Sequence, residues 1–179
     1  ISVKNSKKNF LLSNNFESNI YNILAALAVM SINIDISSLK NDIFLNFKTP
    51  EGRGDISKIK LNDKIINLID ESYNSNPLSL KSAISNFDKM NINGSKKYFL
   101  LGDMLELGIH SNKLHKSIVP IINKSKIDKV FVKGNKVKYV FDKLVKSKKG
   151  KILHNQSQIN ELIKNDLDNN DYLMIIASN

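Results

Sequence analysis

The alternation of apolar and polar positions changes character at about residue 50. Upstream, apolar residues recur at helical spacing after Ser18, the expected N-cap, and a second short helix is expected over about 37–45. The stretch 50–54, which contains proline and glycine, interrupts this pattern and is the best candidate for a domain boundary or hinge. The residues that share the first helical face are Ile20, Ile23, Leu24, Leu27 and Ala28.

From about residue 58, short apolar runs alternate with segments of helical period. The runs show little internal alternation, which is typical of strands covered on both faces. Strand–helix alternation at this spacing predicts an α/β fold with a doubly wound, mostly parallel sheet. The expected strands cover 65–69, 98–101, 130–132, 152–153 and 173–176, and the expected helices cover 78–90, 112–123, 136–145 and 156–167.

The chain has 27 lysines and arginines against 17 acidic residues, which gives a formal net charge of +10. Because an excess of Lys, Asn and Ile is what AT-rich codons produce, we interpret the lysines, including the 146–151 cluster, as a solvated surface. The lack of cysteine excludes disulfides and thiolate metal sites, and it fits a reducing compartment. No apolar run approaches the roughly 20 residues that cross a bilayer, so membrane insertion is not expected.

Two polar segments, 70–77 and 102–108, follow expected strands at the edge where open α/β sheets bind ligands. Asp70 closes a strand, and its carboxylate could accept hydrogen bonds from a ribose diol; the alternative is a capping or loop aspartate. Asn76 is expected to cap the next helix, whereas Asn74 is freer to face a ligand.

Three other sets of residues are candidates for chemistry. Arg53, the only arginine, lies between two glycines, where its planar fork could grip a phosphate; the alternative is a solvated loop residue. Asn19 and Asn22 share a helical face and could recognise a ligand, although capping and solvation are the simpler interpretation. His110 and His115 are five residues apart and do not match the spacing of a helical metal site, so we expect surface or packing roles and no metal site.

Four motifs occur in order at consistent spacing. Residues 70–79 read DESYNSNPLS and residues 102–108 read GDMLELG; upstream, residues 18–26 read SNIYNILAA and residues 52–54 read GRG. In these motifs the chain resembles the Mur ligases, and among them the type that adds D-alanyl-D-alanine to UDP-N-acetylmuramoyl-tripeptide. One motif alone would be a weak indication, but four together over about residues 16–108 are specific.

The resemblance implies that the chain is the last part of a three-domain cytoplasmic enzyme of peptidoglycan synthesis, expected to be monomeric. Residues 1–46 would end the central ATPase domain, and residues 47–179 would form the Rossmann-like C-terminal domain. The implied reaction is ATP-dependent amide formation through an acyl phosphate. Its cofactors would be ATP and Mg²⁺, the metal being bound mostly by the central domain, and its partners would be the muramoyl-tripeptide and D-alanyl-D-alanine.

The same resemblance implies roles for individual residues. Asn19 and Asn22 would line the adenine side of the nucleotide. Arg53 would reach the phosphates or the ribose and serve catalysis, and Asp70 would bind the ribose hydroxyls. The remaining positions form a set around the nucleotide and the incoming dipeptide: Tyr73, which we also assign to nucleotide binding, with Asn74, Asn76 and Asp103.

Three departures from the family pattern affect the expected activity. Ser18 stands where the family has histidine, and residues 176–178 stand where a Lys-Gly-Ser element is expected. No G-x-x-x-x-G-K-[ST] phosphate loop occurs in the sequence. We therefore predict that residues 1–179 alone have neither ATPase nor ligase activity.

Three alternatives remain open. The chain could belong to another ligase of the same superfamily that adds an amino acid, or it could be a catalytically retired α/β ligand-binding domain. The net charge also raises the possibility of a nucleic-acid-binding module. With 7% aromatic residues, dispersed lysines and no nucleic-acid motif, we expect no nucleic-acid partner.

Overall fold

The chain forms two compact units, residues 1–48 and residues 49–179. The structure, a computed structural model, describes residues 2–3, 6–12, 17–46, 52, 54–61, 63–73, 76–105 and 107–177.

The described residues of the first unit form one long helix and little other regular structure. Its elements are β1 (Ser2–Val3) and β2 (Ser6–Lys7), which pair antiparallel, α1 (Glu17–Met30) and the 3₁₀ turn η1 (Ile36–Ser38). Ile23, Leu27 and Ile36 form its buried core. Two predictions were wrong here. Ser18 is the second residue of α1 rather than its N-cap, and the helix expected over 37–45 is only η1, which Asp35 caps, followed by turns.

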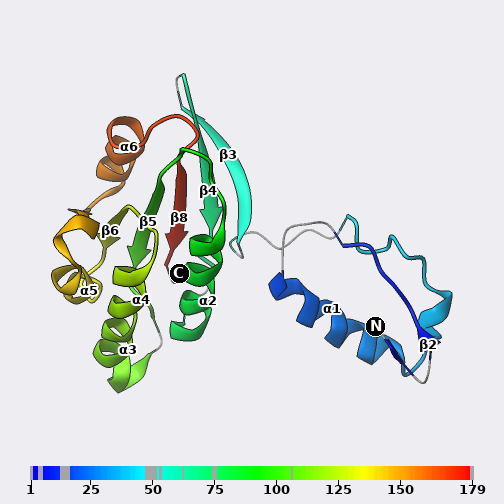
Figure 1. Ribbon diagram of the computed structural model, residues 1–179. Coiled ribbons are helices and arrows are strands. Elements are labelled where there is room, and N and C mark those ends of the chain that lie inside the picture. The colour runs from blue at the N-terminus through cyan, green and yellow to red at the C-terminus, as the bar shows by residue number, and fades with distance from the viewer. Residues whose placement is uncertain are drawn as a thin grey trace. The chain divides into compact units, whose positions relative to one another are not determined.

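The second unit is built on a six-stranded sheet in the order β3-β4-β8-β5-β6-β7 (Figure 1). β3 pairs antiparallel with β4, and every other pair is parallel. This confirms the predicted doubly wound, mostly parallel α/β fold. The strands are β3 (Asp55–Leu61), β4 (Lys64–Asp70), β5 (Lys97–Gly102), β6 (Lys129–Lys133), β7 (Lys149–Ile152) and β8 (Tyr172–Ile176).

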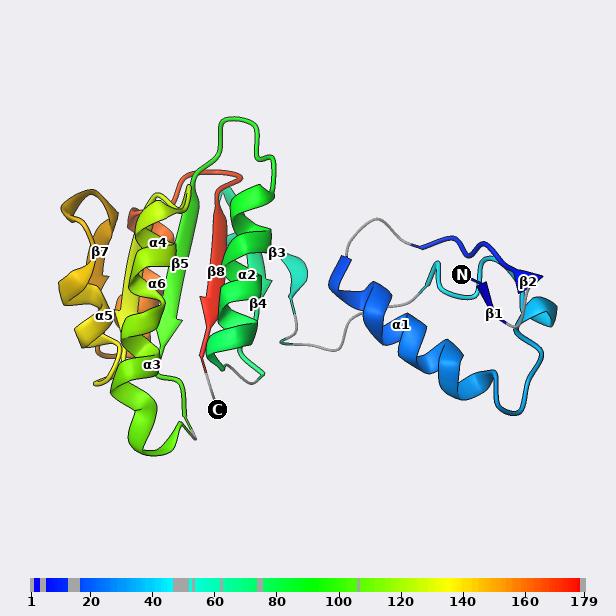
Figure 2. The same ribbon diagram turned by 60° about the horizontal axis from the view of Figure 1, so that its bottom comes forward.

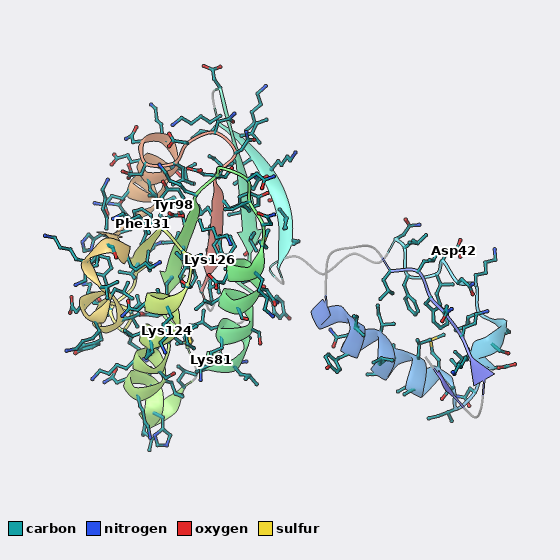
Figure 3. All side chains as sticks on the ribbon, viewed as in Figure 1. Asp42, Lys81, Tyr98, Lys124, Lys126 and Phe131 are labelled. Carbon is teal, nitrogen blue, oxygen red and sulfur yellow. The ribbon has the colours of Figure 1, made fainter. Side chains whose placement is uncertain are left out.

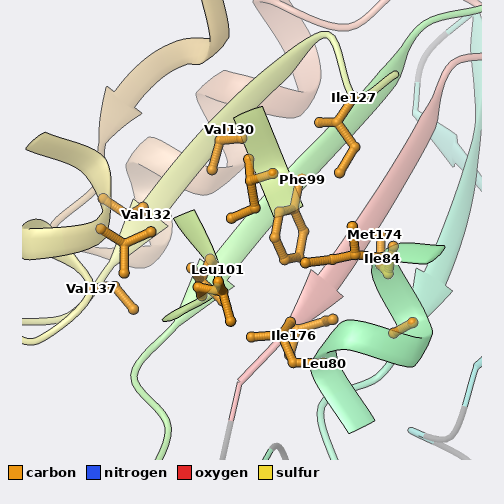
Figure 4. Close-up of a cluster of buried hydrophobic side chains, with 14 of the residues drawn as sticks. Leu80, Ile84, Phe99, Leu101, Ile127, Val130, Val132, Val137, Met174 and Ile176 are labelled. Atoms are coloured by element: carbon orange, nitrogen blue, oxygen red, sulfur yellow. The ribbon is translucent and has the colours of Figure 1, made fainter. Parts of the chain in front are cut away.

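Helices cover both faces of this sheet (Figure 2). One face carries α2, α4 and α5 over a large buried cluster that includes Leu80, Phe99 and Met174 (Figure 4). The other face carries α6, under which the rings of Tyr98 and Phe131 lie 6.1 Å apart between centroids (Figure 3). The helices are α2 (Pro77–Lys89), α3 (Ser111–Ser117), α4 (Val119–Lys124), α5 (Lys138–Lys143) and α6 (Gln156–Asn165), with 3₁₀ turns η2 (Gly108–His110) and η3 (Lys146–Lys148).

Three local features differ from the predictions. The helix expected over 112–123 is divided at Ile118 into α3 and α4, because Pro120 in the first turn of α4 has no N–H to continue the helical ladder. β3 was not expected at all. The lysine cluster 146–151 is not a uniformly solvated face, since Lys148 Nζ donates to the carbonyls of Ser125, at 2.7 Å, and Ile127.

Candidate functional site

The carboxyl ends of β4, β8 and β5 lie side by side at one edge of the sheet, toward the C-terminal end of the chain (Figure 1). Glu71 N–H, just beyond β4, donates to the carbonyl of Ile175 in β8 at 2.9 Å. On the other side of β8, Gly102 approaches Ala177 so closely that a Cβ on Gly102 would lie 2.7 Å from the Ala177 Cβ. The two polar segments singled out in the sequence therefore emerge on either side of the same strand end.

Asp70 is half-buried at the end of β4, and its Oδ1 accepts the backbone N–H of Ser72 at 2.9 Å. Across the strand pair it lies opposite Asp55, the first residue of β3. Two carboxylates in directly opposed positions repel one another. Each is stabilised by its own turn, because Asp55 Oδ1 accepts from Gly52 N–H at 3.1 Å. The loop role weighed for Asp70 is thus present, without a helix cap, and it occupies one of the two carboxylate oxygens.

Tyr73 and Asn76, in the segment after β4, are each held by hydrogen bonds. Tyr73 N–H donates to the carbonyl of Gly52 at 3.1 Å, while the Tyr73 side chain is 58% exposed. Asn76 is the N-cap of α2, as predicted, and its Oδ1 accepts from the N–H groups of Leu78 and Ser79, both at 2.9 Å. The Ser79 hydroxyl accepts the Asn76 N–H in return, which completes a capping box.

Asp103, directly after β5, joins two loops. Its Oδ2 accepts the N–H of Asn135 at 3.0 Å. Its Oδ1 accepts the N–H groups of Lys136 and Val137 at 2.9 and 2.8 Å. Gly134, with φ of +142°, adopts a backbone conformation that favours glycine, and a Cβ there would lie 2.5 Å from the Asp103 Cγ. The carboxylate is therefore committed to holding the loop between β6 and α5 against the end of β5.

His115 is fully buried in α3 beneath the segment that follows β5. Its Nε2 lies 3.1 Å from Met104 N–H, and its Nδ1 lies 2.8 Å from the carbonyl of Ser111. His110 is exposed, so the surface or packing roles expected for the two histidines are confirmed. The connection from His115 to the 102–108 segment was not expected. A signal existed, because His115 falls on the apolar face of its helix, three residues before Ile118.

Three predicted site residues are only partly described or lie outside the described residues. Arg53 and Asn74 lie outside them, and the side chain of Asn19 is likewise not described. Asn22 is exposed on α1 in the first unit. In the second unit the structure brings together the strand ends that carry Asp70 and Asp103, and Tyr73 follows the first of them.

Two side chains with perturbed pKa values, Lys97 and Tyr98, lie at the opposite, amino edge of the sheet. Burial lowers the pKa of Lys97, whose Nζ donates to the carbonyls of Asp88 and Met90 at 2.8 Å each. Burial also raises the pKa of Tyr98, whose hydroxyl donates to the carbonyl of Asp166 at 3.1 Å. Both groups are engaged with backbone carbonyls at helix ends, so we interpret them as structural.

Within the described residues, no group of three or more His, Asp or Glu side chains is placed to hold a metal ion. No helix in this described part of the chain has the length and apolar character of a membrane span.

The fold and the motif-bearing loops at its carboxyl edge define a class of protein. Residues 56–179 match the family described as Mur ligase, glutamate ligase domain, and the chain belongs to this family, which confirms the resemblance found in the sequence.

The relatives carry a more particular name. The chain is 35% identical over 160 residues to the UDP-N-acetylmuramoyl-tripeptide–D-alanyl-D-alanine ligase of Buchnera aphidicola subsp. Baizongia pistaciae, covering 89% of this chain and 33% of that protein. It is 29% identical over 161 residues to the enzyme of the same name from Rickettsia prowazekii, covering 90% and 33%. The chain thus spans about a third of the length of these relatives.

Solved structures agree on the fold. The crystal structure of the MurF ligase from Thermotoga maritima in complex with ADP matches 94% of this chain and 36% of its own, with a TM-score of 0.73 at 21% identity. The MurC ligase of the same organism matches 98% of this chain and 38% of its own, with a TM-score of 0.56 at 16% identity. At these identities the likeness establishes the architecture alone.

Proposed function

We propose that this chain is the C-terminal part of an ATP-dependent ligase that joins D-alanyl-D-alanine to UDP-N-acetylmuramoyl-tripeptide. The observation that carries the proposal is the carboxyl edge of the sheet, where the two specific motifs, residues 70–79 and 102–108, flank the end of β8. Relatives of that name, one of them 35% identical, support it. Residues 1–46 would end the central ATPase domain of a monomeric, cytoplasmic enzyme that contributes to cell-wall synthesis and division, and residues 47–179 would form its C-terminal domain.

In the proposed reaction, a terminal carboxylate oxygen of the muramoyl-tripeptide bonds to the γ-phosphorus of ATP, the bond to the β-phosphate oxygen breaks, and ADP leaves, which gives an acyl phosphate. The free amine of the dipeptide then attacks the acyl carbon, an amide bond forms, the C–O bond to phosphate breaks, and the amine proton is released to a base or to solvent. Such chemistry depends on positioning and charge neutralisation. Mg²⁺ would be held mostly by the central ATPase domain.

Asp70 is the residue of this chain best suited to the nucleotide. One Oδ1 lone pair accepts Ser72 N–H, and a carboxylate has about four acceptor positions, so capacity remains for a ribose diol. We propose that Arg53 contacts the phosphates, because its sequence neighbours Gly52 and Gly54 form hydrogen bonds at this strand end. Gly54 N–H donates to the carbonyl of Asp70 at 2.7 Å. Asn19 and Asn22 are proposed for the adenine side.

On the dipeptide side, Tyr73, Asn74, Asn76 and Asp103 are proposed to shape the site. For Asn76 and Asp103 the side-chain oxygens are already engaged with backbone N–H groups. Their contribution is therefore to hold the two loops in place. Tyr73, with an exposed side chain, is the better candidate for direct contact with nucleotide or dipeptide.

The test is a coupled phosphate-release assay on the full-length ligase with ATP, muramoyl-tripeptide and D-alanyl-D-alanine. We expect turnover with the dipeptide, little with single amino acids, and none from residues 1–179 alone. Arg53→Lys should lower kcat/KM by about tenfold or more, since lysine cannot make a bidentate phosphate contact. Lys58→Arg, an exposed charge-conserving change on β3, is the matched control.

Each alternative predicts a different result. Preference for a single amino acid would identify another ligase of the superfamily. Nucleotide binding without turnover under any condition would indicate a retired domain. An Arg53→Lys enzyme as active as the wild type would remove Arg53 from the catalytic role.

A further inference from the structure

His115 is a buried polar side chain whose hydrogen-bond partners determine its chemical state. Ser111 O can only accept, so Nδ1 must carry the proton that it donates across 2.8 Å. Met104 N–H can only donate, so Nε2 must be unprotonated to accept across 3.1 Å. The imidazole is therefore neutral and in a single tautomer, and both of its nitrogens are in use. Ser111 is itself buried, with its hydroxyl 3.4 Å from Nδ1.

Met104, whose N–H donates to His115, lies where several segments of the second unit meet. Gly102, Asp103 and Met104 are consecutive, and each is attached to a different segment. Gly102 lies against Ala177 beyond β8. Asp103 accepts three N–H groups of the loop after β6. Met104 has its side chain in the main core and its N–H on His115 in α3.

We propose that His115 is a positioning residue for the 102–108 segment, and that through Met104 N–H it determines where this segment presents Asp103 and Leu105 at the carboxyl edge. The inference rests on the proposed ligase function for its kinetic consequence, but its structural part does not. Leu105, the next residue along, is 43% exposed, so a segment anchored at Met104 carries an outward-facing side chain immediately afterwards. If Met104 shifted, the Leu105 side chain would shift with it, and displacements of about 1 Å can lower a reaction rate by about a hundredfold.

Two substitutions separate the hydrogen bond from the volume. His115→Phe keeps an aromatic ring of similar size but offers no acceptor to Met104 N–H. His115→Gln places an amide oxygen near the position of Nε2 and can accept the same bond. Ile122→Ala is the control for general loss of stability, because Ile122 is fully buried in the same helical layer but does not contact the segment through a hydrogen bond.

The first measurement is amide hydrogen exchange of the 179-residue chain. We expect Met104 N–H to exchange about tenfold or more faster in His115→Phe, relative to the change in core amides, and to be restored in His115→Gln. Ile122→Ala should accelerate amides without singling out Met104. If Met104 exchanges at the same rate in all the variants, His115 does not anchor it and the inference is wrong.

The second measurement is steady-state kinetics of the full-length ligase. We expect His115→Phe to lower kcat/KM for the dipeptide by about tenfold or more, with His115→Gln recovering most of it and Ile122→Ala remaining within about threefold of wild type. An active wild-type enzyme whose dipeptide kinetics His115→Phe leaves unchanged would overturn the positioning role while the proposed function stood. A wild-type enzyme without ligase activity would overturn the proposed function and the kinetic role with it, while the exchange result would still decide whether His115 anchors the loop.

Discussion

Removing the Asp103 carboxylate, which holds a loop at the carboxyl edge of the sheet, should lower the free energy of unfolding by an amount that follows from its hydrogen bonds. It accepts three backbone N–H groups at 2.8, 2.9 and 3.0 Å. Bonds to a charged acceptor are worth about 1.5–3 kcal/mol each when buried, and partial exposure here reduces this to about 1 kcal/mol each. Asp103→Ala should therefore lower the free energy of unfolding by about 3 kcal/mol. Asp103→Asn keeps one acceptor oxygen, so it should lose about half of that.

Urea unfolding of the 179-residue chain, followed by far-UV circular dichroism, measures this difference. With a slope of about 1.5 kcal/mol/M for a unit of this size, the midpoint should fall by about 2 M in Asp103→Ala and about 1 M in Asp103→Asn. Asp142→Asn removes the same charge from an exposed position on α5 and should change the midpoint little. The reasoning is refuted if Asp103→Ala unfolds within about 0.5 kcal/mol of wild type, or if Asp103→Asn is as unstable as Asp103→Ala.

Three further changes test other features of the second unit by the same unfolding assay. Gly134→Ala should cost about 2–3 kcal/mol, because φ of +142° is strained for alanine and its Cβ would displace the Asp103 carboxylate; a neutral result would contradict the close approach. Asn76→Ala should cost about 1 kcal/mol and Asn76→Ser much less, since serine can still cap α2; equal losses would argue against the cap. Because burial lowers the pKa of Lys97, the folded state binds this proton less tightly than the unfolded state does. The free energy of unfolding of the wild type, relative to that of Lys97→Met, should therefore rise with pH between the lowered pKa and 10.5. A fall over this range would show that the charged form of Lys97 stabilises the folded state.

The sheet was predictable wherever its strands are buried on both faces. β4, β5, β6 and β8 each coincide with an apolar run, because helices cover both sides of these strands. β3 escaped prediction for the opposite reason. It is an edge strand with exposed or half-buried side chains throughout, Ile56 among them at 46% exposure, so no apolar run marks it. β7 begins at Lys149, whereas the apolar run that marks it in the sequence begins only at 152. Gly150 packs against the ring of Phe131 and has no apolar side chain, so it gave no sign of the strand in the sequence.

For the candidate site, the sequence could predict only which strand ends come together. Strand ends and family motifs indicated 70–77 and 102–108, and both do meet at one edge. The partners of Asp103 lie 32 to 34 residues away along the chain, and no local pattern in the sequence connects them. The same holds for the bond from Met104 to His115, which depends on how α3 packs beneath the segment. Long-range backbone bonds of this kind arise from tertiary packing, so periodicity cannot reveal them.

The contacts divide the GDMLELG motif into two parts with different roles. Gly102 is required because Ala177 approaches it too closely for a side chain. Asp103 is required because it holds the loop after β6, and Met104 because it packs in the core and donates its N–H to His115. Each of the first three positions is therefore explained without a ligand. Leu105 is the first position whose side chain projects outward. A residue specific to a motif is often assumed to touch the substrate, but the Asp103 carboxylate already accepts three backbone N–H groups. It follows that substitutions at 102–104 should affect stability and activity together, whereas substitution of Leu105 could affect substrate binding while leaving stability unchanged.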